Sequence, residues 1–152
     1  MKIIHDFINR KAKFNYELIE FFTAGILLEG TEIKSIRQGK VSFIDSYCQF
    51  VDLELSLKKL YIAEYDHAFA GINHNSTRDR KLLLTKRELK KLKKKVDEKG
   101  LTIVPTKLFF DDKGWAKIEI ALAKGKNKSD KRAVIKEKDI QRDMDRSIKE
   151  AK

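Results

Sequence analysis

The sequence predicts a mostly β protein, a small closed antiparallel barrel with flanking helices, followed by a basic C-terminal segment. Before residue 124 the chain consists largely of short stretches that alternate in polarity or are rich in branched side chains, as β-strands are. The longest stretch contains a glycine, and bends at glycines close small barrels. Residues 124–152 differ, with no aromatic side chain and a net charge of +5. They lack the apolar surface that offsets the entropy of folding, so we expect them to be disordered alone.

The first half of the chain predicts three strands. Residues 9–13 form a basic cluster that we expect in a solvated N-terminal arm. Residues 15–28 are rich in aromatic and branched side chains and predict one long strand, with a bulge or bend at Gly25. Residues 41–52 and 53–66 alternate in polarity, so they predict an antiparallel pair joined by a short turn.

Residues 101–110 and 115–124 predict a second hairpin around the turn sequence DDKG. Pro105 in the first of these strands predicts an edge position or a bulge, because proline has no backbone N–H for the ladder. The two carboxylates in the turn, Asp111 and Asp112, are explained by the turn itself.

Two helices are predicted between these strands. Residues 30–40 form a short helix that ends at Gly39. Residues 85–100 form a longer one that begins with a capping box of Thr85 and Glu88. Lysines surround the longer helix, whereas a purely solvated helix usually interleaves both signs, so contact with nucleic acid is favoured. In the short helix, the side chains expected to face solvent are Glu32, Lys34, Ser35 and Arg37.

This order of elements, with a long strand bent at a glycine, is typical of an oligonucleotide-binding-type barrel. The aromatic residues of the predicted strands are interpreted as filling of the barrel rather than as stacking platforms. We therefore expect recognition of a folded RNA by its shape and phosphates, not of a single strand by its bases. These aromatic residues are Tyr16, Tyr47, Tyr61, Tyr65 and Trp115.

The chain is strongly basic, with a net charge of +11 and a pI near 9.6, which indicates a polyanionic partner. The charge lies in two blocks, +7 in residues 78–99 and +5 in residues 124–152. One cysteine, Cys48, excludes an intramolecular disulfide, and the start of the chain has no signal-peptide pattern. No apolar run is long enough to span a bilayer. We expect a cytoplasmic protein with no membrane partner.

An enzymatic function is not expected. The three histidines and the cysteine have no metal-ligand spacing, and no nucleophile motif occurs, so we expect neither a metal nor another cofactor. An alternative is a metal-dependent nuclease that uses Asp111, Asp112 and Glu119, which would require RNA cleavage that depends on Mg²⁺.

A series of segments occurs in order from about Asn9 to Arg142. They are NRKAKFNYELIEFFTAGILLEGTEIKSIRQGK, DSY at 45–47, NH at 73–74, RDRKLLL at 78–84, KGLTIVPTKLFF, AKIEIALAKGK, and then DKR and IKEKD. Together they resemble the small protein B family, bacterial RNA-binding proteins that work with transfer-messenger RNA to rescue stalled ribosomes. The chain departs from the family pattern at Thr23, where the family often has glutamate, and at Ser129, where it commonly has tyrosine or histidine.

The resemblance implies a barrel, residues 1–123, that holds the tRNA-like domain of transfer-messenger RNA at its elbow in the ribosomal A site. It implies that the tail, residues 124–152, enters the empty mRNA channel and becomes helical there. The implied partners are transfer-messenger RNA, the small-subunit rRNA of the decoding centre and mRNA channel, and, through the charged RNA, elongation factor Tu. We expect a monomer. A general RNA-binding translation or ribosome-assembly factor is the alternative.

Three positions that match the family's barrel surface or its support are Asn9, Glu32 and Leu83. Leu83 is either an apolar RNA contact or only the outer face of a strand. Basic side chains near them are expected to neutralise RNA phosphates. The predicted RNA-binding residues of the barrel are Asn9, Arg10, Lys11, Lys13, Glu32, Lys34, Arg37, Arg78, Arg80, Lys81 and Leu83. Those of the tail, for the ribosome, are Lys124, Gly125, Lys126, Lys128, Asp130, Lys131, Arg132, Lys136, Lys138 and Arg142.

Overall fold

The computed structural model describes residues 6–69 and 71–126. The helices in this part of the chain are α1 (Arg10–Asn15), α2 (Gly30–Arg37) and α3 (Lys86–Lys99). Its strands are β1 (Phe7–Ile8), β2 (Tyr16–Ile26), β3 (Val41–Ser42), β4 (Tyr47–Val51), β5 (Glu54–Lys58), β6 (Tyr61–Ile62), β7 (Arg80–Leu83), β8 (Thr102–Phe110) and β9 (Ala116–Gly125).

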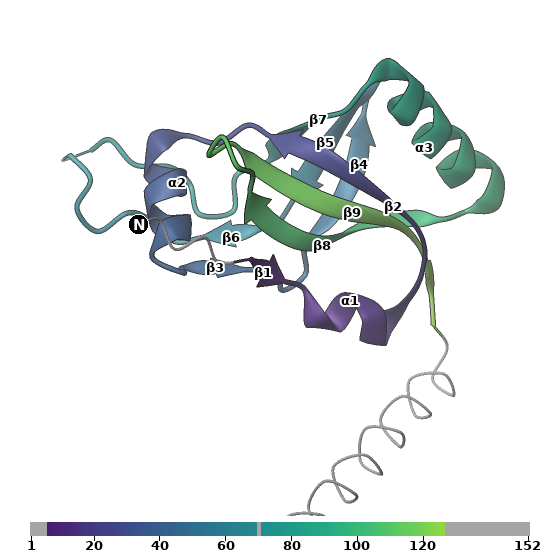
Figure 1. Ribbon diagram of the computed structural model, residues 1–152, viewed down its shortest axis with the longest axis horizontal. Coiled ribbons are helices and arrows are strands. Elements are labelled where there is room, and N and C mark those ends of the chain that lie inside the picture. The colour runs from purple at the N-terminus through teal and green to yellow at the C-terminus, as the bar shows by residue number, and fades with distance from the viewer. Residues whose placement is uncertain (1–5, 70, 127–152) are drawn as a thin grey trace, which may run out of the picture.

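The main sheet closes on itself. Its strand order is β1-β8-β4-β5-β7-β2-β9, and β9 pairs again with β8, so the ring from β8 to β9 is complete. All pairings are antiparallel. The helices lie outside the barrel at three separate places (Figure 1). The predicted closed antiparallel barrel with flanking helices is confirmed.

Aliphatic side chains fill the barrel. Alternation in β5 and β7 turns Leu55, Leu57 and Leu82 inward, where they are buried together with Ile118 and Ile120 of β9. The interpretation of the aromatic residues as barrel filling is wrong. Tyr61 and Trp115 are 44% and 66% exposed, and Tyr16, Tyr47 and Tyr65 are half-buried.

Strand β2 is the long strand that the sequence predicts. It pairs with β9 over most of its length and with β7 at its end. The register shift lies between Leu18 and Glu20, so the bulge expected at Gly25 is not there. A Cβ atom on Gly25 would lie 3.3 Å from the Cβ of Leu83 on the neighbouring strand. The glycine therefore allows a close approach of β2 and β7.

The two alternating stretches after α2 form the expected antiparallel pair, with Val51 opposite Glu54. Each stretch is interrupted, however. The first breaks near Asp45, whose φ is 63°, and the second at Lys59, whose φ is 59°. Left-handed residues cannot continue a strand, so the outer pieces, β3 and β6, pair with each other in a separate two-stranded sheet.

The second hairpin, β8 and β9, also forms as predicted. The Asp111 carboxylate accepts hydrogen bonds from the backbone N–H groups of Lys113 and Trp115 at 3.0 and 2.9 Å, which fixes the turn. The bulge expected at Pro105 is present, since the register of β8 shifts between Pro105 and Lys107. Strand β9 continues to Gly125, two residues beyond the boundary predicted for the barrel.

Local signals set the ends of α2 and α3. In α3, the Thr85 hydroxyl accepts from the Glu88 N–H at 3.2 Å, and the Glu88 carboxylate accepts from the Thr85 N–H at 3.1 Å. Gly100 ends this helix with a φ of 63°, and Gly39 follows α2 with a φ of 78°. Both helices and their terminal signals are as predicted.

The basic cluster of residues 9–13 is not a solvated arm. It forms most of α1, because Ala12 packs into a small apolar cluster with Val104 and Ala123. Helix α1 thereby lies against β8 and β9 below the barrel in Figure 1. None of the helices in the described residues is both long and apolar enough to cross a membrane.

Candidate nucleic-acid interface

Glu32 is fully buried and lies at the centre of a cluster of charges. Its carboxylate accepts hydrogen bonds from the Arg78 Nη2 at 2.5 Å, from the buried Arg80 Nε, and from the Glu29 backbone N–H at 2.8 Å. The expectation that Glu32 faces solvent or RNA is therefore wrong, and Ser35 is buried as well. Glu32 links the first turn of α2 to the start of β7.

The charges of this cluster compensate one another. Burial alone would raise the pKa of the Glu32 carboxyl, but the hydrogen bonds from Arg78, from the Glu29 N–H and from Arg80 outweigh it and hold that pKa below its usual value. Burial lowers the pKa of Arg80, and Glu32 opposes that effect. Glu32 is thus a carboxylate with two guanidinium partners.

Arg80 is contradicted as a phosphate ligand, because its side chain is fully buried. Besides Glu32, it donates from Nη1 to the Leu60 carbonyl at 2.5 Å and from Nη2 to the Ser76 carbonyl at 3.2 Å. Arg78 remains partly exposed. Lys81 is exposed and pairs with Glu54 at 2.8 Å, so Arg78 and Lys81 stay candidates for RNA contact.

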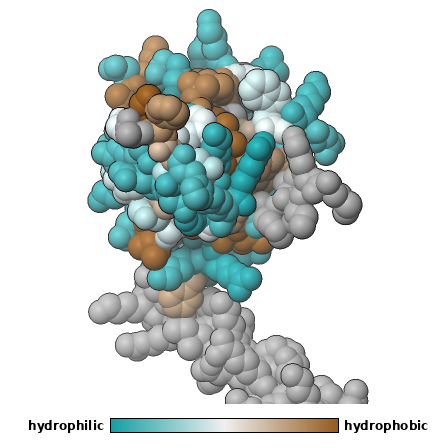
Figure 2. All heavy atoms as spheres, turned by 90° about the vertical axis from the view of Figure 1, so that its left-hand side faces the viewer, coloured by the Kyte–Doolittle hydropathy of each residue, from teal (hydrophilic) through white to brown (hydrophobic). Residues whose placement is uncertain are grey.

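Helix α2, which carries two further predicted cations, lies at the left-hand end of the molecule in Figure 1, the side that faces the viewer in Figure 2. Lys34 and Arg37 are exposed. The Lys34 Nζ lies 5.3 Å from the ring centroid of Tyr65, and the guanidinium carbon of Arg37 lies 6.0 Å from that of Phe110. On this face hydrophilic side chains surround separate small apolar groups.

The loop after β6 is fastened to α2 by a residue for which the sequence predicted no role. His74 is buried, with Nε2 2.9 Å from the Ile62 carbonyl oxygen and Nδ1 2.8 Å from the Thr31 hydroxyl. A carbonyl can only accept, so Nε2 carries a proton and donates to Ile62, while the Thr31 hydroxyl is the partner of Nδ1. Asn73 supports the loop by bonding both backbone groups of Tyr65.

Asn9 links the start of α1 to β8 through two hydrogen bonds. Its Nδ2 donates to the Pro105 carbonyl at 2.8 Å, and its backbone N–H donates to the Thr106 carbonyl at 2.8 Å. These bonds place α1 beside the β8 bulge. Three cations of the predicted site, Arg10, Lys11 and Lys13, are exposed on this helix.

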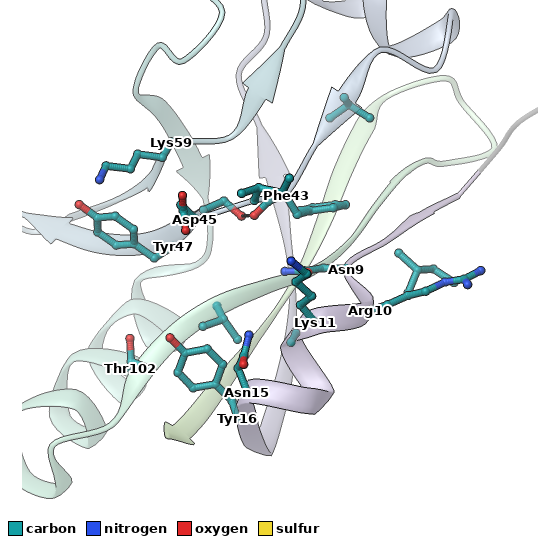
Figure 3. A pocket seen from close by; sticks show the side chains of 16 residues that line it. Asn9, Arg10, Lys11, Asn15, Tyr16, Phe43, Asp45, Tyr47, Lys59 and Thr102 are labelled. Atoms are coloured by element: carbon teal, nitrogen blue, oxygen red, sulfur yellow. Dashed lines mark hydrogen bonds between the residues drawn. The ribbon is translucent and has the colours of Figure 1, made fainter. Parts of the chain in front are cut away.

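Two hollows flank α1. The larger one, of about 830 Å³, lies between α1, the loop after β3 and the first residues of β8 (Figure 3). The smaller one, of about 620 Å³, lies between α1, the β8 bulge and Lys126. Asn9 and Arg10 border both. The basic helix therefore separates two concave surfaces.

Leu83 points outward, as the alternation of β7 requires. It is 46% exposed, whereas Leu82 before it is 2% exposed. Gly25 lies opposite Leu83 on one side and opposite Lys117 on the other. The outer surface of β7, β2 and β9 thus places a leucine, a glycine and a lysine in one row. We call these three residues the outer row.

Lys117 was missed by the sequence prediction of the site. The sequence did indicate that Lys117 faces outward. Ile118 is fully buried, and neighbouring residues of an alternating strand face opposite sides of the sheet. What the sequence lacked was the register that sets Gly25 between Leu83 and Lys117. Trp115, two residues before Lys117, is 66% exposed.

The lysines of α3 are partly neutralised by an acid that is distant in sequence. Glu20 of β2 lies 2.6 Å from the Lys91 Nζ and 3.8 Å from the Lys95 Nζ. The hydrogen bond from Lys91 lowers the pKa of Glu20. Lys93 pairs with Asp97 at 3.2 Å. The cations of α3 outside these three pairs are exposed to solvent.

The acids of the alternative nuclease site have separate partners. Asp111 fixes its own turn, and the Glu119 carboxylate accepts from the Thr106 hydroxyl at 2.8 Å. Across residues 6–69 and 71–126, no three acidic, histidine or cysteine side chains gather as metal ligands would.

The profile of the family described as SmpB protein matches residues 7–150. The chain belongs to the SmpB family. It is 54% identical to the SsrA-binding protein of Parabacteroides distasonis over 141 residues, which are 93% of this chain and 92% of that protein. It is 48% identical to the SsrA-binding protein of Trichodesmium erythraeum, over 98% and 94% of the two chains.

A solved SmpB-family structure has a similar fold. The structure described as "tmRNA-SmpB: a journey to the center of the bacterial ribosome" superposes with a TM-score of 0.67 and 44% identity. The match covers 87% of this chain and 94% of that one. The predicted resemblance to the small protein B family is confirmed.

The residues that this SmpB-family chain was predicted to use do not form one patch. Asn9, Arg10, Lys11 and Lys13 lie at α1, close to the end of β9, while the Glu32 cluster lies at α2 on a different side of the barrel (Figure 1). Leu83 belongs to the outer row.

The first residues of the predicted tail are held by the barrel. Lys124 and Gly125 belong to β9 and pair with Glu17 and Tyr16 of β2. The Lys126 N–H donates to the Asn15 carbonyl at 3.0 Å, and its Nζ to the Lys13 carbonyl at 2.9 Å. The other predicted tail residues lie outside the described ones. They are Lys128, Asp130, Lys131, Arg132, Lys136, Lys138 and Arg142.

Proposed function

We propose that this protein binds the tRNA-like domain of transfer-messenger RNA and acts with it in trans-translation on stalled ribosomes. Membership of the SmpB family over residues 7–150 carries this proposal. It is supported by the curated relatives named SsrA-binding protein. It is further supported by the 44% identical structure whose description places tmRNA and SmpB in the bacterial ribosome.

The outer row supplies a surface suited to the RNA. Because Gly25 has no side chain, Leu83 packs closely over it and lies at the sheet surface in the same row as Lys117. Leu83 offers apolar contact area, and Lys117 offers a charge for a phosphate. A structured RNA is recognised by such contacts to its shape and backbone.

The basic side chains at α1 and α2 offer further phosphate contacts away from the outer row. Arg10, Lys11 and Lys13 are exposed and add phosphate contacts at one end of the barrel, and Lys34, Arg37, Arg78 and Lys81 add them elsewhere. Asn9, Glu32 and Arg80 act by holding α1, α2 and β7 in place rather than by touching RNA. Their substitution would weaken binding through loss of structure.

The remaining parts of the proposal concern the tail and the partners. Residues up to Lys126 form the RNA-binding unit, and the basic segment after them enters the vacant mRNA channel of the small subunit. Elongation factor Tu meets the protein only through the charged RNA. The protein is a monomeric, non-enzymatic adaptor of the cytoplasm.

A competition assay tests the proposal. The labelled tRNA-like domain is bound to the full chain and displaced by the unlabelled domain or by bulk tRNA. We expect the unlabelled domain to compete at least about tenfold better than bulk tRNA, a difference of roughly 1.4 kcal/mol. Equal competition would instead support a general factor for structured RNA.

The Leu83→Ala variant tests the surface. We expect it to weaken binding of the tRNA-like domain, because it removes apolar area from the outer row. The matched control is Leu53→Ala, which truncates a leucine that is 77% exposed in the β4–β5 turn. Equal affinities of the two variants would contradict the assignment of the outer row.

A further inference from the structure

The loop between β6 and β7 exposes two apolar side chains, Phe69 and Ile72, which we call the apolar tip. Phe69 is 86% exposed and Ile72 is 68% exposed. Figure 1 shows this loop extending beyond α2 at the left-hand end of the molecule, away from the barrel. Apolar side chains that are scattered singly over a surface are ordinary, whereas these two belong to one short segment.

A single tight turn presents both side chains. The Ile72 N–H donates to the Phe69 carbonyl at 2.9 Å, which closes a turn of four residues. Gly71, the third of them, has a φ of 78°. A type II turn requires a positive φ at this position, and glycine adopts it without strain. The spacing of Phe69 and Ile72 is therefore set by the backbone.

The base of the loop is braced against the rest of the protein. The Asn73 side chain accepts from the Tyr65 N–H at 3.1 Å and donates to the Tyr65 carbonyl at 2.9 Å. The next residue, His74, is buried and is bonded to Ile62 and Thr31. Ordering of a loop on binding subtracts from affinity. Because folding already closes this loop, a partner gains more from contact with its tip.

The local charge of this loop is opposite to that of the whole chain. Residues 60–77 contain two acids, Glu64 and Asp66, and no lysine or arginine, whereas the chain as a whole carries +11. Asp66 pairs with Lys40 at 3.4 Å. Glu64 is exposed and pairs with no cation in the described part of the chain. The loop therefore suits a basic partner.

These features favour a protein partner over RNA. An aromatic ring can stack on a base, but an isoleucine lacks a flat ring, and RNA binding also needs cations for the phosphates. Acids beside the tip repel phosphates. Protein interfaces, in contrast, bury a few large apolar side chains at their centre and surround them with polar groups.

We propose that the apolar tip docks into an apolar pocket of another protein, and that lysine or arginine side chains border this pocket. Phe69 and Ile72 enter the pocket, and Glu64 faces one of the bordering cations. The loop thereby gives the chain a protein-binding surface of its own. The inference goes beyond the proposed function, because none of the RNA contacts proposed above uses the apolar tip.

Two synthetic amphipathic peptides test the chemistry of the partner with the full chain. One is built from leucine and lysine, the other from leucine and glutamate, and each is titrated by calorimetry. Net charge alone would make this basic chain prefer the glutamate peptide, so binding of the lysine peptide reports a different surface. We expect the lysine peptide to bind, and Phe69→Ser to weaken it at least about tenfold. Absence of binding to the natural chain would overturn the proposal.

The matched control for the apolar side chain is Leu53→Ser. Leu53 is 77% exposed in the β4–β5 turn, and no acid-rich braced loop surrounds it. We expect this variant to bind the lysine peptide as the natural chain does. If both variants lose affinity equally, the peptide binds any exposed apolar side chain, and the assignment to the loop is overturned.

Glu64→Lys tests the basic border of the pocket. We expect it to weaken the lysine peptide by about twofold to fivefold at low salt, as loss of an exposed ion pair costs, and less at high salt. Asp112→Lys makes the same change of charge at an exposed acid of the β8–β9 turn and should have a smaller effect. Equal effects would show a response to net charge only and would overturn the basic border.

Three measurements on the same variants distinguish other occupants of the apolar tip. We expect Phe69→Ser to bind the tRNA-like domain as the natural chain does, whereas a tenfold loss would assign the tip to RNA. Self-association in sedimentation that Phe69→Ser abolishes would assign it to a second copy. Tighter binding of the lysine peptide after truncation behind Lys126 would assign it to the chain's own basic segment. Each of these three results would overturn the proposal, and none depends on the competition with bulk tRNA.

Discussion

Glu32 and Arg80 form an ion pair in which both side chains are fully buried. The pair joins the start of α2 to the start of β7, which are distant in sequence. A buried pair adds little net stability by itself, but removal of one partner leaves an uncompensated charge in the interior. The substitution of either residue is therefore expected to affect folding before it affects RNA binding.

The Glu32→Gln variant tests this expectation. It keeps the side-chain volume but leaves Arg80 and Arg78 without their carboxylate. We expect the free energy of unfolding, measured by urea denaturation, to fall by about 3–5 kcal/mol. Glu54→Gln is the matched control, since Glu54 pairs with Lys81 at the surface, and its loss should stay below about 1 kcal/mol. Equal losses would contradict the role of Glu32.

Acid should destabilise the protein partly through Glu32. The pKa of Glu32 is held below its usual value of 4.5, so between that value and the folded pKa the unfolded chain binds more protons than the folded one. Stability therefore rises with pH across this window. The contribution is complete above about pH 4.5 and is lost as the pH falls through the folded pKa.

The measurement compares urea denaturation of the natural protein and of Glu32→Gln between pH 7 and pH 3. Glu20, whose pKa is also lowered, is present in both proteins and cancels. We expect the difference in unfolding free energy between the two proteins to shrink as the pH falls below about 4.5. A constant difference would show that Glu32 does not titrate in this way.

Gly25→Ala tests the close approach of β2 and β7. The added Cβ would lie 3.3 Å from the Leu83 Cβ, which is fixed by its strand, so one strand must move. We expect a loss of about 1 kcal/mol in unfolding free energy, as for mild overpacking, together with weaker binding of the tRNA-like domain. The control is Gly125→Ala, where the new Cβ meets nothing within 4 Å. Equal effects of both variants would argue against the contact.

Lys117→Ala tests the charge of the outer row. If Lys117 contacts one phosphate, its loss should make the plot of log affinity against log salt less steep, by about 1 in the magnitude of the slope. Lys113→Ala removes a lysine from the exposed β8–β9 turn and serves as the control for net charge. The measurement is binding of the tRNA-like domain across a salt series. An unchanged slope for Lys117→Ala would remove this residue from the interface.

Local sequence signals predicted the elements whose causes are local. Thr85, Glu88 and Gly100 mark the ends of α3 because caps form between residues close in sequence. The β8–β9 hairpin was predictable for the same reason, since Asp111 fixes the turn within a few residues.

The predictions that were wrong concern contacts between residues that are distant in sequence. Arg80 was assigned to the surface because it is an arginine, although it shares the alternation of the inward-facing Leu82. Its partner Glu32 lies 48 residues earlier, so no local pattern joins them. Glu20 was likewise missed as the partner of Lys91, 71 residues away. The candidate site was therefore predictable as a set of cations but not as a surface.

Truncation after Lys126 tests the division of labour between barrel and tail. This cut keeps both bonds of Lys126 to α1, to the Asn15 and Lys13 carbonyls. We expect affinity for the tRNA-like domain to stay within about tenfold of that of the full chain, while peptide tagging on stalled ribosomes is lost. Loss of RNA binding would contradict the division.

A second cut, after Gly125, isolates the two bonds of Lys126. We expect it to lower the melting temperature relative to the cut after Lys126, because α1 then loses two hydrogen bonds to the end of the chain. Identical melting temperatures would show that these bonds add no stability.

The pairing of Gly125 with Tyr16, extended by Lys126, gives the basic segment a fixed origin beside α1. The 26 residues after Lys126 span at most about 90 Å when extended and about 40 Å as one helix. While the barrel stays in place, these 26 residues can touch only points within about 90 Å of Lys126. The orientation of the barrel on its RNA thus decides which ribosomal surfaces are within range.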